Sequence, residues 1–417
     1  MILLLFEKHV LWTDGTRTFY LDQVTWIVAG LSFAWVVSFL VSRYLRRRAL
    51  RRRPRRTHHK LPKRIIRVKR DLSSRYLRPN FSGNIHAVGI GRFSGSDDYY
   101  IQVFINDAAA AIWTGPGTLP KSYRGVPVVS VEMPRAVFLS SPVPASPDQF
   151  PNGIRERQET IIGGISGANT NLTGQSGTIG YFCTRKSKLP RRREIHLLSN
   201  SHVFADLRKA KADETDLIMQ PSPGEPSPNR PIGTLVNFSA VKFETGTKDP
   251  NHVDAAIAKL WAPHRHNAVI PQIGGIKGHV RSQEIEVGEG VRKFGRTTGY
   301  TEGRIFSICL DIWIRYDRTG KSAFFQNQLL IQPALPCFAK FVAEGDSGSL
   351  VVDERQHAIG LIFGGMAKLP ESLTKSAGAD AGGKIVVSLG KPQRIESYGV
   401  ANPISEVLDR LKIDLVV

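Results

Sequence analysis

Short apolar runs separated by glycine-containing turns dominate the second half of the chain. Runs of this kind follow one another at residues 176–184, 195–200, 254–261, 289–295, 303–315, 327–333, 348–353 and 356–363. Many short strands joined by glycine turns are typical of β-barrels and β-sandwiches. The last segment differs, because its apolar residues recur at helical spacing and predict a C-terminal helix. These residues are Ile404, Val407, Leu408 and Leu411.

A second group of apolar runs precedes this region. Residues 85–91, 99–105 and 126–132 read as strands separated by polar turns, so we expect a small α+β domain over 80–142. It contains no constellation of titratable residues, and we assign it no chemistry. A linker rich in proline and serine over 143–157 then leads into a mainly β region at 158–417.

The N-terminal region contains the longest apolar stretch. Residues 24–42 are 19 residues without a charge, which is about the length needed to cross a hydrocarbon core. They predict a transmembrane helix between a short segment at 1–23 and a basic juxtamembrane linker at 43–79. A buried core helix and a cleaved signal peptide are the alternatives.

The charge of the chain is concentrated after this stretch. The formal net charge is +21, and residues 43–70 contain 15 of the 57 Lys and Arg residues and no acid. The positive-inside rule then predicts a single-pass protein of the inner or plasma membrane whose C-terminal region is cytoplasmic. Anionic lipid headgroups are the expected partner of residues 43–70. Nucleic-acid binding and a nuclear import signal are less favoured alternatives.

A run near the C-terminus, from Gly345 to Leu350, is typical of the loop that carries a serine nucleophile. Gly-Asp-Ser-Gly places Ser347 on a tight loop, where the N–H groups of Gly345 and Ser347 converge beside its hydroxyl. A histidine, His202, ends an apolar stretch, and Asp254 begins another. Imidazole takes the proton of a serine nucleophile, and a carboxylate fixes the imidazole tautomer. Asp216 is a rival for Asp254, and an ordinary turn is the rival for Ser347.

In the order His202, Asp254, Ser347, residues 158–417 resemble the chymotrypsin-like serine peptidases. The resemblance implies two six-stranded antiparallel β-barrels with a C-terminal helix. It also implies a His202–Asp254–Ser347 triad with an oxyanion hole formed by Gly345 and Ser347. The chain has three cysteines, an odd and sparse set that suits a reducing compartment.

A second block, Gly295-Arg296-Thr297-Thr298-Gly299, resembles bacterial members of this family. It implies that Arg296 forms an ion pair with Asp346 and supports the oxyanion loop. A cleaved N-terminus at Ile161 is the alternative partner of Asp346. In the bacterial relatives, two cysteines flank this block and form a disulfide. This chain has Arg292 and Glu302 at those positions, and we expect them to form an ion pair.

The resemblance also implies the substrate contacts. Phe341, six residues before Ser347, would form the floor of the primary pocket and favour a small or apolar residue before the cleaved bond. Residues Phe363, Gly364 and Gly365 would pair with the substrate backbone by β-addition.

These features predict a membrane-anchored serine endopeptidase that acts on proteins or peptides. No cofactor or metal is expected, since the sequence shows no ligand-spaced His/Cys cluster and no phosphate-binding glycine loop. The alternative is a catalytically inactive trypsin-fold module that tethers a partner at the membrane.

Overall fold

The computed structural model falls into two units, Met1–His59 and Lys60–Val417. It describes residues 10–13, 18–20, 61–77, 84–106, 119–138, 153–172, 175–186, 194–207, 212–213, 215–262, 264–316, 320–335, 337–368 and 396–417. In the first unit, strands β1 (Val10–Thr13) and β2 (Thr18–Tyr20) pair as an antiparallel hairpin. The apolar stretch 24–42 lies outside the described residues. Among the helices that are described, none has the length and apolar character to span a membrane.

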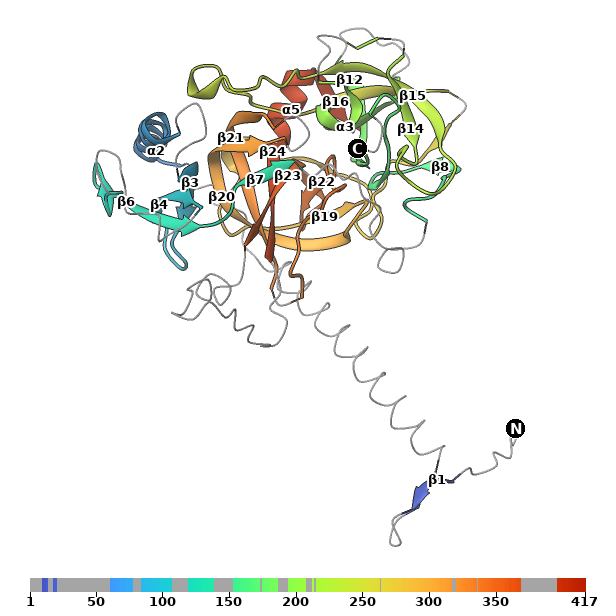
Figure 1. Cartoon of the computed structure of the whole chain (residues 1–417), viewed down its shortest axis with the longest axis horizontal. Helices are drawn as coiled ribbons and strands as arrows, with labels where there is room; N and C mark the ends of the chain where they lie inside the picture. The colour runs from blue at the N-terminus through green and yellow to red at the C-terminus, as the bar shows by residue number, and fades with distance from the viewer. Residues whose placement is uncertain are drawn as a thin grey trace, which may run out of the picture. The chain divides into compact units, whose positions relative to one another are not determined.

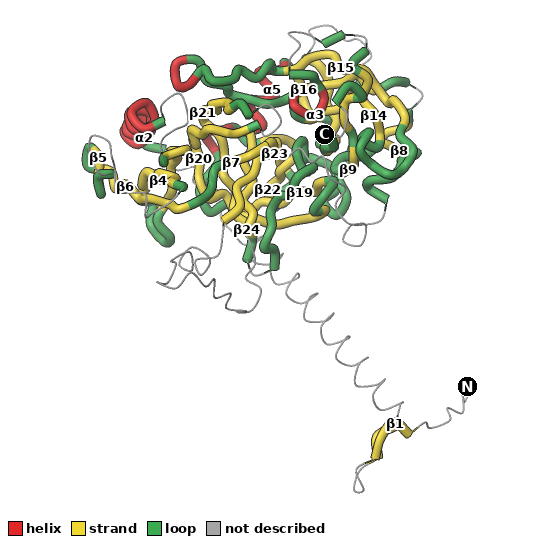
Figure 2. The backbone as a smooth tube through the Cα atoms, in the orientation of Figure 1, coloured by secondary structure: helices red, strands yellow, loops and turns green. Residues whose placement is uncertain are grey.

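The second unit is mainly β, and Figure 2 shows strands throughout it with few helices. Its first sheet contains seven strands. One of them, β13 (His196–Ser199), precedes His202, and another, β16 (Ala256–Leu260), follows Asp254. In sheet order, the strands are β10 (Ala168–Asn169), β14 (Leu217–Gln220), β15 (Arg230–Phe238), β16 (Ala256–Leu260), β13 (His196–Ser199), β12 (Tyr181–Arg185) and β25 (Ile413–Leu415). Two short pairs complete this half, β9 (Ile165–Ser166) with β11 (Thr178–Ile179) and β8 (Thr160–Ile161) with β17 (Arg265–His266).

The second sheet contains a closed ring of six strands. In ring order they are β19 (Gly290–Gly295), β22 (Leu350–Asp353), β23 (His357–Lys368), β24 (Glu396–Pro403), β21 (Ser322–Pro333) and β20 (Gly299–Arg315). The ring closes because β20 also pairs with β19, with Gly295 opposite Gly299. This ring agrees with the second expected barrel, whereas a two-barrel count stays a prediction.

The strands expected at 85–91, 99–105 and 126–132 are confirmed as β3 (Ile85–Arg92), β4 (Tyr99–Ile105) and β6 (Val126–Glu132). They do not build a sheet of their own. Together with β5 (Ser122–Tyr123), they continue the second sheet beyond β20, because Ile90 of β3 lies opposite Ile308 of β20. The long β20 would otherwise present unpaired backbone N–H and C=O groups at this edge, and β3 supplies their partners.

The end of the basic tract is a helix rather than a linker. Helix α2 (Lys63–Tyr76) buries Val68 and Leu72 in the same cluster as β3 residues. Lys69 is also buried, and its Nζ lies 2.6 Å from Oδ1 of Asp311 on β20. This part of the tract therefore packs on the protein, and its Lys69 is not available to lipid.

The C-terminal helix is confirmed as α5 (Ile404–Leu411). Its four predicted apolar residues are buried in a cluster that also contains Leu197 of the first sheet and Leu361 of the second. The helix therefore contributes to the core shared by both sheets. The remaining described elements are α3 (Ser201–Phe204), β7 (Ala136–Phe138), β18 (Gly278–His279) and two single 3-10 turns, η3 (Gly246–Lys248) and η4 (Ser282–Glu284). Figure 1 shows β7 between β20 and β23, both of which it pairs with.

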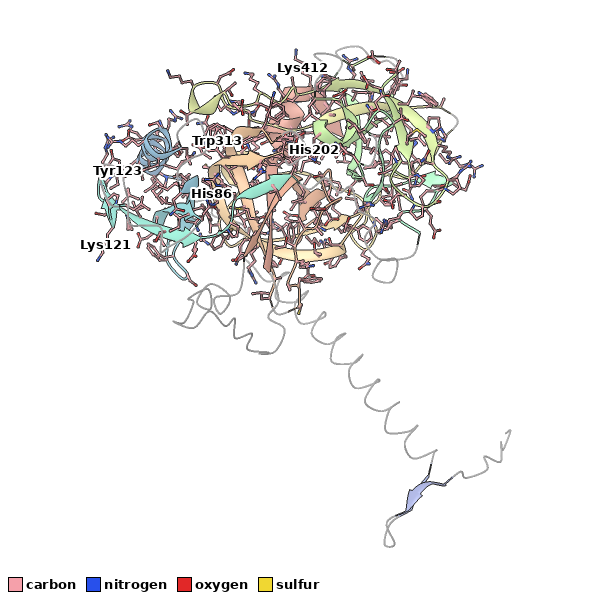
Figure 3. All side chains as sticks on the ribbon, in the orientation of Figure 1. His86, Lys121, Tyr123, His202, Trp313 and Lys412 are labelled. Atoms are coloured by element: carbon pink, nitrogen blue, oxygen red, sulfur yellow. The ribbon has the colours of Figure 1, made fainter. Side chains whose placement is uncertain are left out.

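One buried histidine on β3 makes stability depend on pH. His86 is fully buried, its Nε2 lies 2.7 Å from the carbonyl O of Met133, and Figure 3 labels it. Burial lowers the pKa of His86 to about 4, from 6.5. Between these values the unfolded chain binds a proton that the folded chain does not, so stability falls as the pH falls.

We expect this group to cost the wild type about 2–3 kcal/mol of stability between pH 7 and pH 4.5. Urea unfolding at both pH values, compared with His86→Gln, isolates the contribution, because the variant lacks the titrating group. Equal losses in the two proteins would contradict the expectation.

Candidate active site

His202 and Asp254 lie side by side at the ends of two paired strands. β13 leads directly into α3, which contains His202, and Asp254 lies just before β16. Ser199 at the end of β13 lies opposite Ala256 at the start of β16. The segment after β13, with His202, therefore meets the segment before β16, with Asp254. Nδ1 of His202 is 2.5 Å from Oδ2 of Asp254, and both side chains are buried.

The carboxylate of Asp254 is fixed by further donors. Its Oδ1 accepts the N–H of Ser201 at 2.7 Å and that of His202 at 3.3 Å. The hydroxyl of Tyr316 donates to Oδ2 at 3.5 Å. Burial raises the pKa of Tyr316 well above its usual value, and Asp254 raises it further, so the hydroxyl keeps its proton. Asp254 is therefore held in one orientation toward the imidazole.

The rival carboxylate, Asp216, has other partners. Its Oδ1 accepts from Nδ2 of Asn169 at 3.0 Å, and its Oδ2 accepts the N–H of Asp213 at 3.0 Å. These contacts are typical of a structural aspartate.

Ser347 lies on a tight loop before β22. Gly345 and Gly348 on either side have φ of 93° and 94°, values that favour glycine. The Oγ of Ser347 is 3.5 Å from the carbonyl O of Phe363. The N–H groups of Asp346, Gly348 and Ser349 donate to backbone carbonyls. Within the described part of the chain, those of Gly345 and Ser347 have no acceptor, so they are available to an oxyanion.

Two connections join the serine loop to the histidine. The N–H of Thr178 donates to the carbonyl O of Ser347 at 2.8 Å, and the hydroxyl of Ser199 donates to the carbonyl O of Thr178 at 2.8 Å. The ring of Phe138 lies 4.8 Å from that of His202 and 6.0 Å from that of Phe363, centroid to centroid. Three residues far apart in sequence, His202, Asp254 and Ser347, are thus brought to one region.

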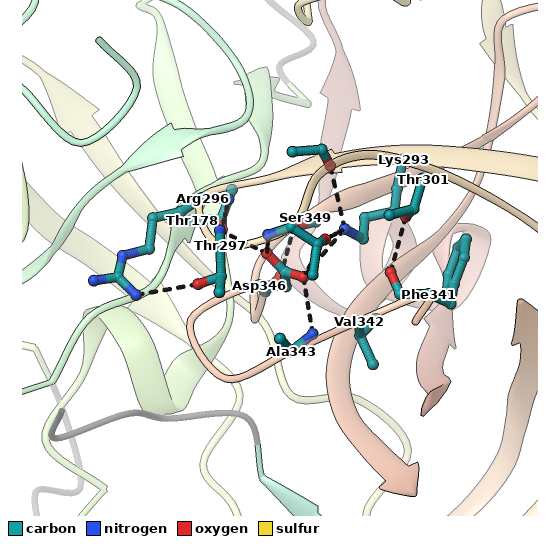
Figure 4. Close-up of polar contacts among 12 residues, drawn as sticks. Thr178, Lys293, Arg296, Thr297, Thr301, Phe341, Val342, Ala343, Asp346 and Ser349 are labelled. Carbon is teal, nitrogen blue, oxygen red and sulfur yellow. Dashed lines mark hydrogen bonds and ion pairs between the residues drawn. The ribbon is translucent and has the colours of Figure 1, made fainter. Parts of the chain in front are cut away.

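The ion pair expected between Asp346 and Arg296 is wrong. Asp346 pairs with Lys293, whose Nζ is 3.1 Å from Oδ2 while both side chains are fully buried. The N–H of Thr297 also donates to the carboxylate, at 2.8 Å (Figure 4). The hydroxyl of Thr298 donates to it at 2.7 Å. The N–H groups of Ala343 and Thr298 donate to the same carboxylate at 3.0 Å and 3.1 Å.

The reason lies in strand geometry. Alternate residues of a strand face the same side, so Lys293 shares the inward face of β19 with buried Val291. Burial lowers the pKa of Lys293, and the neighbouring Asp346 opposes that shift. Asp346 thus already has a cationic partner, and Ile161 is buried in β8.

Arg296 instead pairs with Glu225. Its Nε lies 2.5 Å from Oε1 of Glu225, whose other oxygen is 2.7 Å from Nε of Arg155. Glu225 also accepts the hydroxyl hydrogen bond of Ser166 at 2.9 Å. Arg296 therefore joins the block after β19 to a buried carboxylate between β14 and β15.

The position expected to form the primary pocket is apolar. Phe341 is fully buried, and its carbonyl O accepts from the hydroxyl of Thr301 at 2.8 Å. A Cβ built on Gly303 or on Gly399 would lie 2.8 Å from the Phe341 ring, so the ring packs on these two glycines. Its role as the pocket floor stays a prediction.

Arg292 lies directly opposite Glu302 on paired strands, as the expected replacement for a disulfide requires. The hydroxyl of Tyr300 donates to Oε1 of Glu302 at 2.7 Å. All three cysteines, Cys183, Cys309 and Cys337, are free thiols. Over the described residues, no cluster of His, Cys, Asp and Glu could hold a metal ion.

Comparisons with solved structures return proteases. The chain is similar to Protease A of Thermobifida fusca, with 16% identity, 62% of this chain and 99% of that chain covered, and a TM-score of 0.37. It is similar to a chymotrypsin of Cellulomonas bogoriensis, with 15% identity, 62% and 98% covered, and a TM-score of 0.34. It is also similar to a Nocardiopsis protease, with 15% identity, 62% of this chain and 100% of that chain covered, and a TM-score of 0.35. No family model matches the chain, and no curated protein matches its sequence.

Proposed function

We propose that the chain is a serine endopeptidase. The observation that carries the proposal is the 2.5 Å contact between Nδ1 of His202 and Oδ2 of Asp254, in a region that also holds Ser347 on a tight glycine loop. An imidazole paired with a buried carboxylate is the arrangement that activates a serine hydroxyl. No second function is favoured by a specific observation.

In the proposed reaction, Oγ of Ser347 attacks the carbonyl carbon of the substrate while His202 takes the hydroxyl proton. Asp254 holds the imidazole tautomer and stabilises the imidazolium that forms. The N–H groups of Gly345 and Ser347 donate to the oxyanion of the tetrahedral intermediate. His202 then protonates the leaving amine, and water hydrolyses the acyl-enzyme by the same steps.

The apolar side chain of Phe341 favours a small or apolar residue before the cleaved bond. A peptide library digested by the full chain tests both activity and this preference, with Ser347→Ala as the inactive control. Cleavage after Lys or Arg would refute the preference. Equal cleavage by Ser347→Ala would refute the serine mechanism.

We further propose that residues 24–42 anchor the enzyme in a membrane, with residues 43–62 against anionic lipid and the mainly β unit on the cytoplasmic side. The support is the uncharged 19-residue stretch followed by a dense basic tract. Extraction of the full chain by detergent but not by alkaline carbonate is the expected behaviour. Release by carbonate alone would contradict the anchor.

A further inference from the structure

One edge of β23 changes partner close to the serine loop. β22 pairs with this edge as far as Leu361, which lies opposite Leu350. Beyond that point β7 takes the edge, antiparallel, with Phe138 opposite Gly364 and Val137 opposite Gly365. The other edge of β7 pairs with β20. A segment more than 200 residues earlier in the chain thus pairs with the two glycines assigned to substrate binding.

The backbones of β7 and β23 approach closely. A Cβ built on Gly364 would lie 3.2 Å from the carbonyl O of Val137, so little space remains for a side chain. An extended substrate on this edge would need the same space. The two cannot be bound there together.

The side chain of Phe138 fills an aromatic pocket, of which the imidazole of His202 is one wall. The Phe138 ring meets that of His202 edge-on at 73° and is 4% exposed. Its other aromatic neighbours are Tyr316, Phe325 and Phe363.

The register relates this pocket to the bond that would be cleaved. Consider a substrate that pairs with β23 in the same register as β7, so that one of its residues takes the place of Phe138 opposite Gly364. The next residue of that substrate would then lie opposite Phe363. The carbonyl O of Phe363 is 3.5 Å from Oγ of Ser347, so that next residue would present its carbonyl to the nucleophile. Phe138 therefore has the place of the second residue before the cleaved bond.

We propose that β7 is an internal peptide ligand of the substrate-binding edge, and that the pocket filled by Phe138 selects an aromatic residue at the second position before the cleaved bond. The assignment of this edge of β23 to substrate binding rests on the proposed function. A substrate has to displace β7, so the full chain has low activity until this strand is released or out-competed.

The size of the effect follows from the tether. β7 belongs to the same chain as the edge that it covers, and a tethered ligand reaches an effective concentration of the order of mM, comparable to or above typical KM values. Weakening β7 is therefore expected to raise kcat/KM for a peptide substrate by about tenfold or more.

The first arm of the test compares full-length Phe138→Ala with the wild type. We expect Phe138→Ala to react faster with a fluorophosphonate at Ser347 and to cleave peptides with an aromatic second residue faster, whereas Phe138→Tyr stays near the wild type. Phe93→Ala is the matched control, because Phe93 is 41% exposed and contacts Tyr100, away from the site. If Phe138→Ala fails to fold, Phe138→Leu replaces it. Equal rates for the folded variant and the wild type would overturn the proposal.

The second arm needs no catalysis. The peptide Met-Pro-Arg-Ala-Val-Phe, which copies residues 133–138, is added to Ser347→Ala and to Ser347→Ala/Phe138→Ala. We expect it to slow hydrogen exchange of residues 362–366 in the double variant and to have less effect in the single variant. No protection in the folded double variant would overturn the proposal.

The two arms separate this proposal from the proposed function. Peptide binding without any reaction at Ser347 in any folded variant would support β7 as a ligand of the edge and refute the peptidase. Fast reaction of the wild type at Ser347, unchanged by Phe138→Ala, would support the peptidase and refute the role of β7.

Discussion

Asp254→Asn is expected to lower kcat for peptide hydrolysis about 10⁴-fold while leaving the fold in place. The amide of Asn cannot stabilise the imidazolium of His202, and it favours the wrong tautomer at a contact that is now 2.5 Å. Because Asp254 acts on the transition state, kcat and kcat/KM should fall together. Initial rates over a range of substrate concentrations measure both.

Asp216→Asn is the matched control for this change. Asp216 is also fully buried, but it accepts hydrogen bonds from Asn169 and the backbone of Asp213. We expect its replacement to lower stability and to leave kcat within a few-fold of the wild type. A large loss of kcat in Asp216→Asn, with Asp254→Asn still active, would reverse the assignment of the acid.

Lys293→Met is expected to lower the free energy of unfolding by about 3–5 kcal/mol. It removes the cation from a fully buried pair and leaves the carboxylate of Asp346 uncompensated next to Ser347. Urea unfolding gives the free energy, and the rate of fluorophosphonate labelling at Ser347 reports the oxyanion loop. Both should fall, because the loop that positions Gly345 and Ser347 is anchored through Asp346.

Lys242→Met provides the comparison. Lys242 and Asp249 form an exposed pair, with side chains 48% and 58% accessible, and such pairs contribute about 0–1 kcal/mol. Lys293→Met/Asp346→Leu should recover part of the lost stability, because no buried charge is left unpaired. A loss in Lys293→Met no greater than that in Lys242→Met would contradict the role of the buried pair.

The sequence predicted many of the strands, because strands depend on local patterns. Alternation of apolar runs with glycine turns located β12, β13 and β16 of the first sheet and β19 to β23 of the second, and the helical spacing after Ile404 located α5. The runs did not include β14, β15, β24 and β25. His202, Asp254 and Ser347 each stand at the end or start of an apolar run. Strand pairing then brings the ends of such runs together, so their proximity follows from the topology.

Long-range pairings were harder to predict. The partner of Asp346 was assigned by resemblance to Arg296, although the alternation of β19 already placed Lys293 on the inward face beside Val291. The roles of Glu225 and Tyr316 had no comparable signal, because their contacts join segments 71 and 62 residues apart. β7 gave no signal of its own either, since three residues are too short to show alternation.

The separate domain expected at 80–142 shows the same limit. Its strands were predicted from their own pattern, but their place in the second sheet depends on β20, more than 200 residues later. The burial of Lys69 also depends on Asp311, which no local pattern relates to a basic tract.

The most direct test of the central claim is fluorophosphonate labelling of the detergent-solubilised full chain, with the adduct mapped by mass spectrometry. Wild type and Phe138→Ala are labelled beside Ser347→Ala, so that an internal ligand does not hide an activated serine. We predict a single adduct at Ser347, faster in Phe138→Ala and absent in Ser347→Ala. An adduct elsewhere, or no adduct in either folded protein with Ser347 present, would contradict the assignment of Ser347 as the nucleophile.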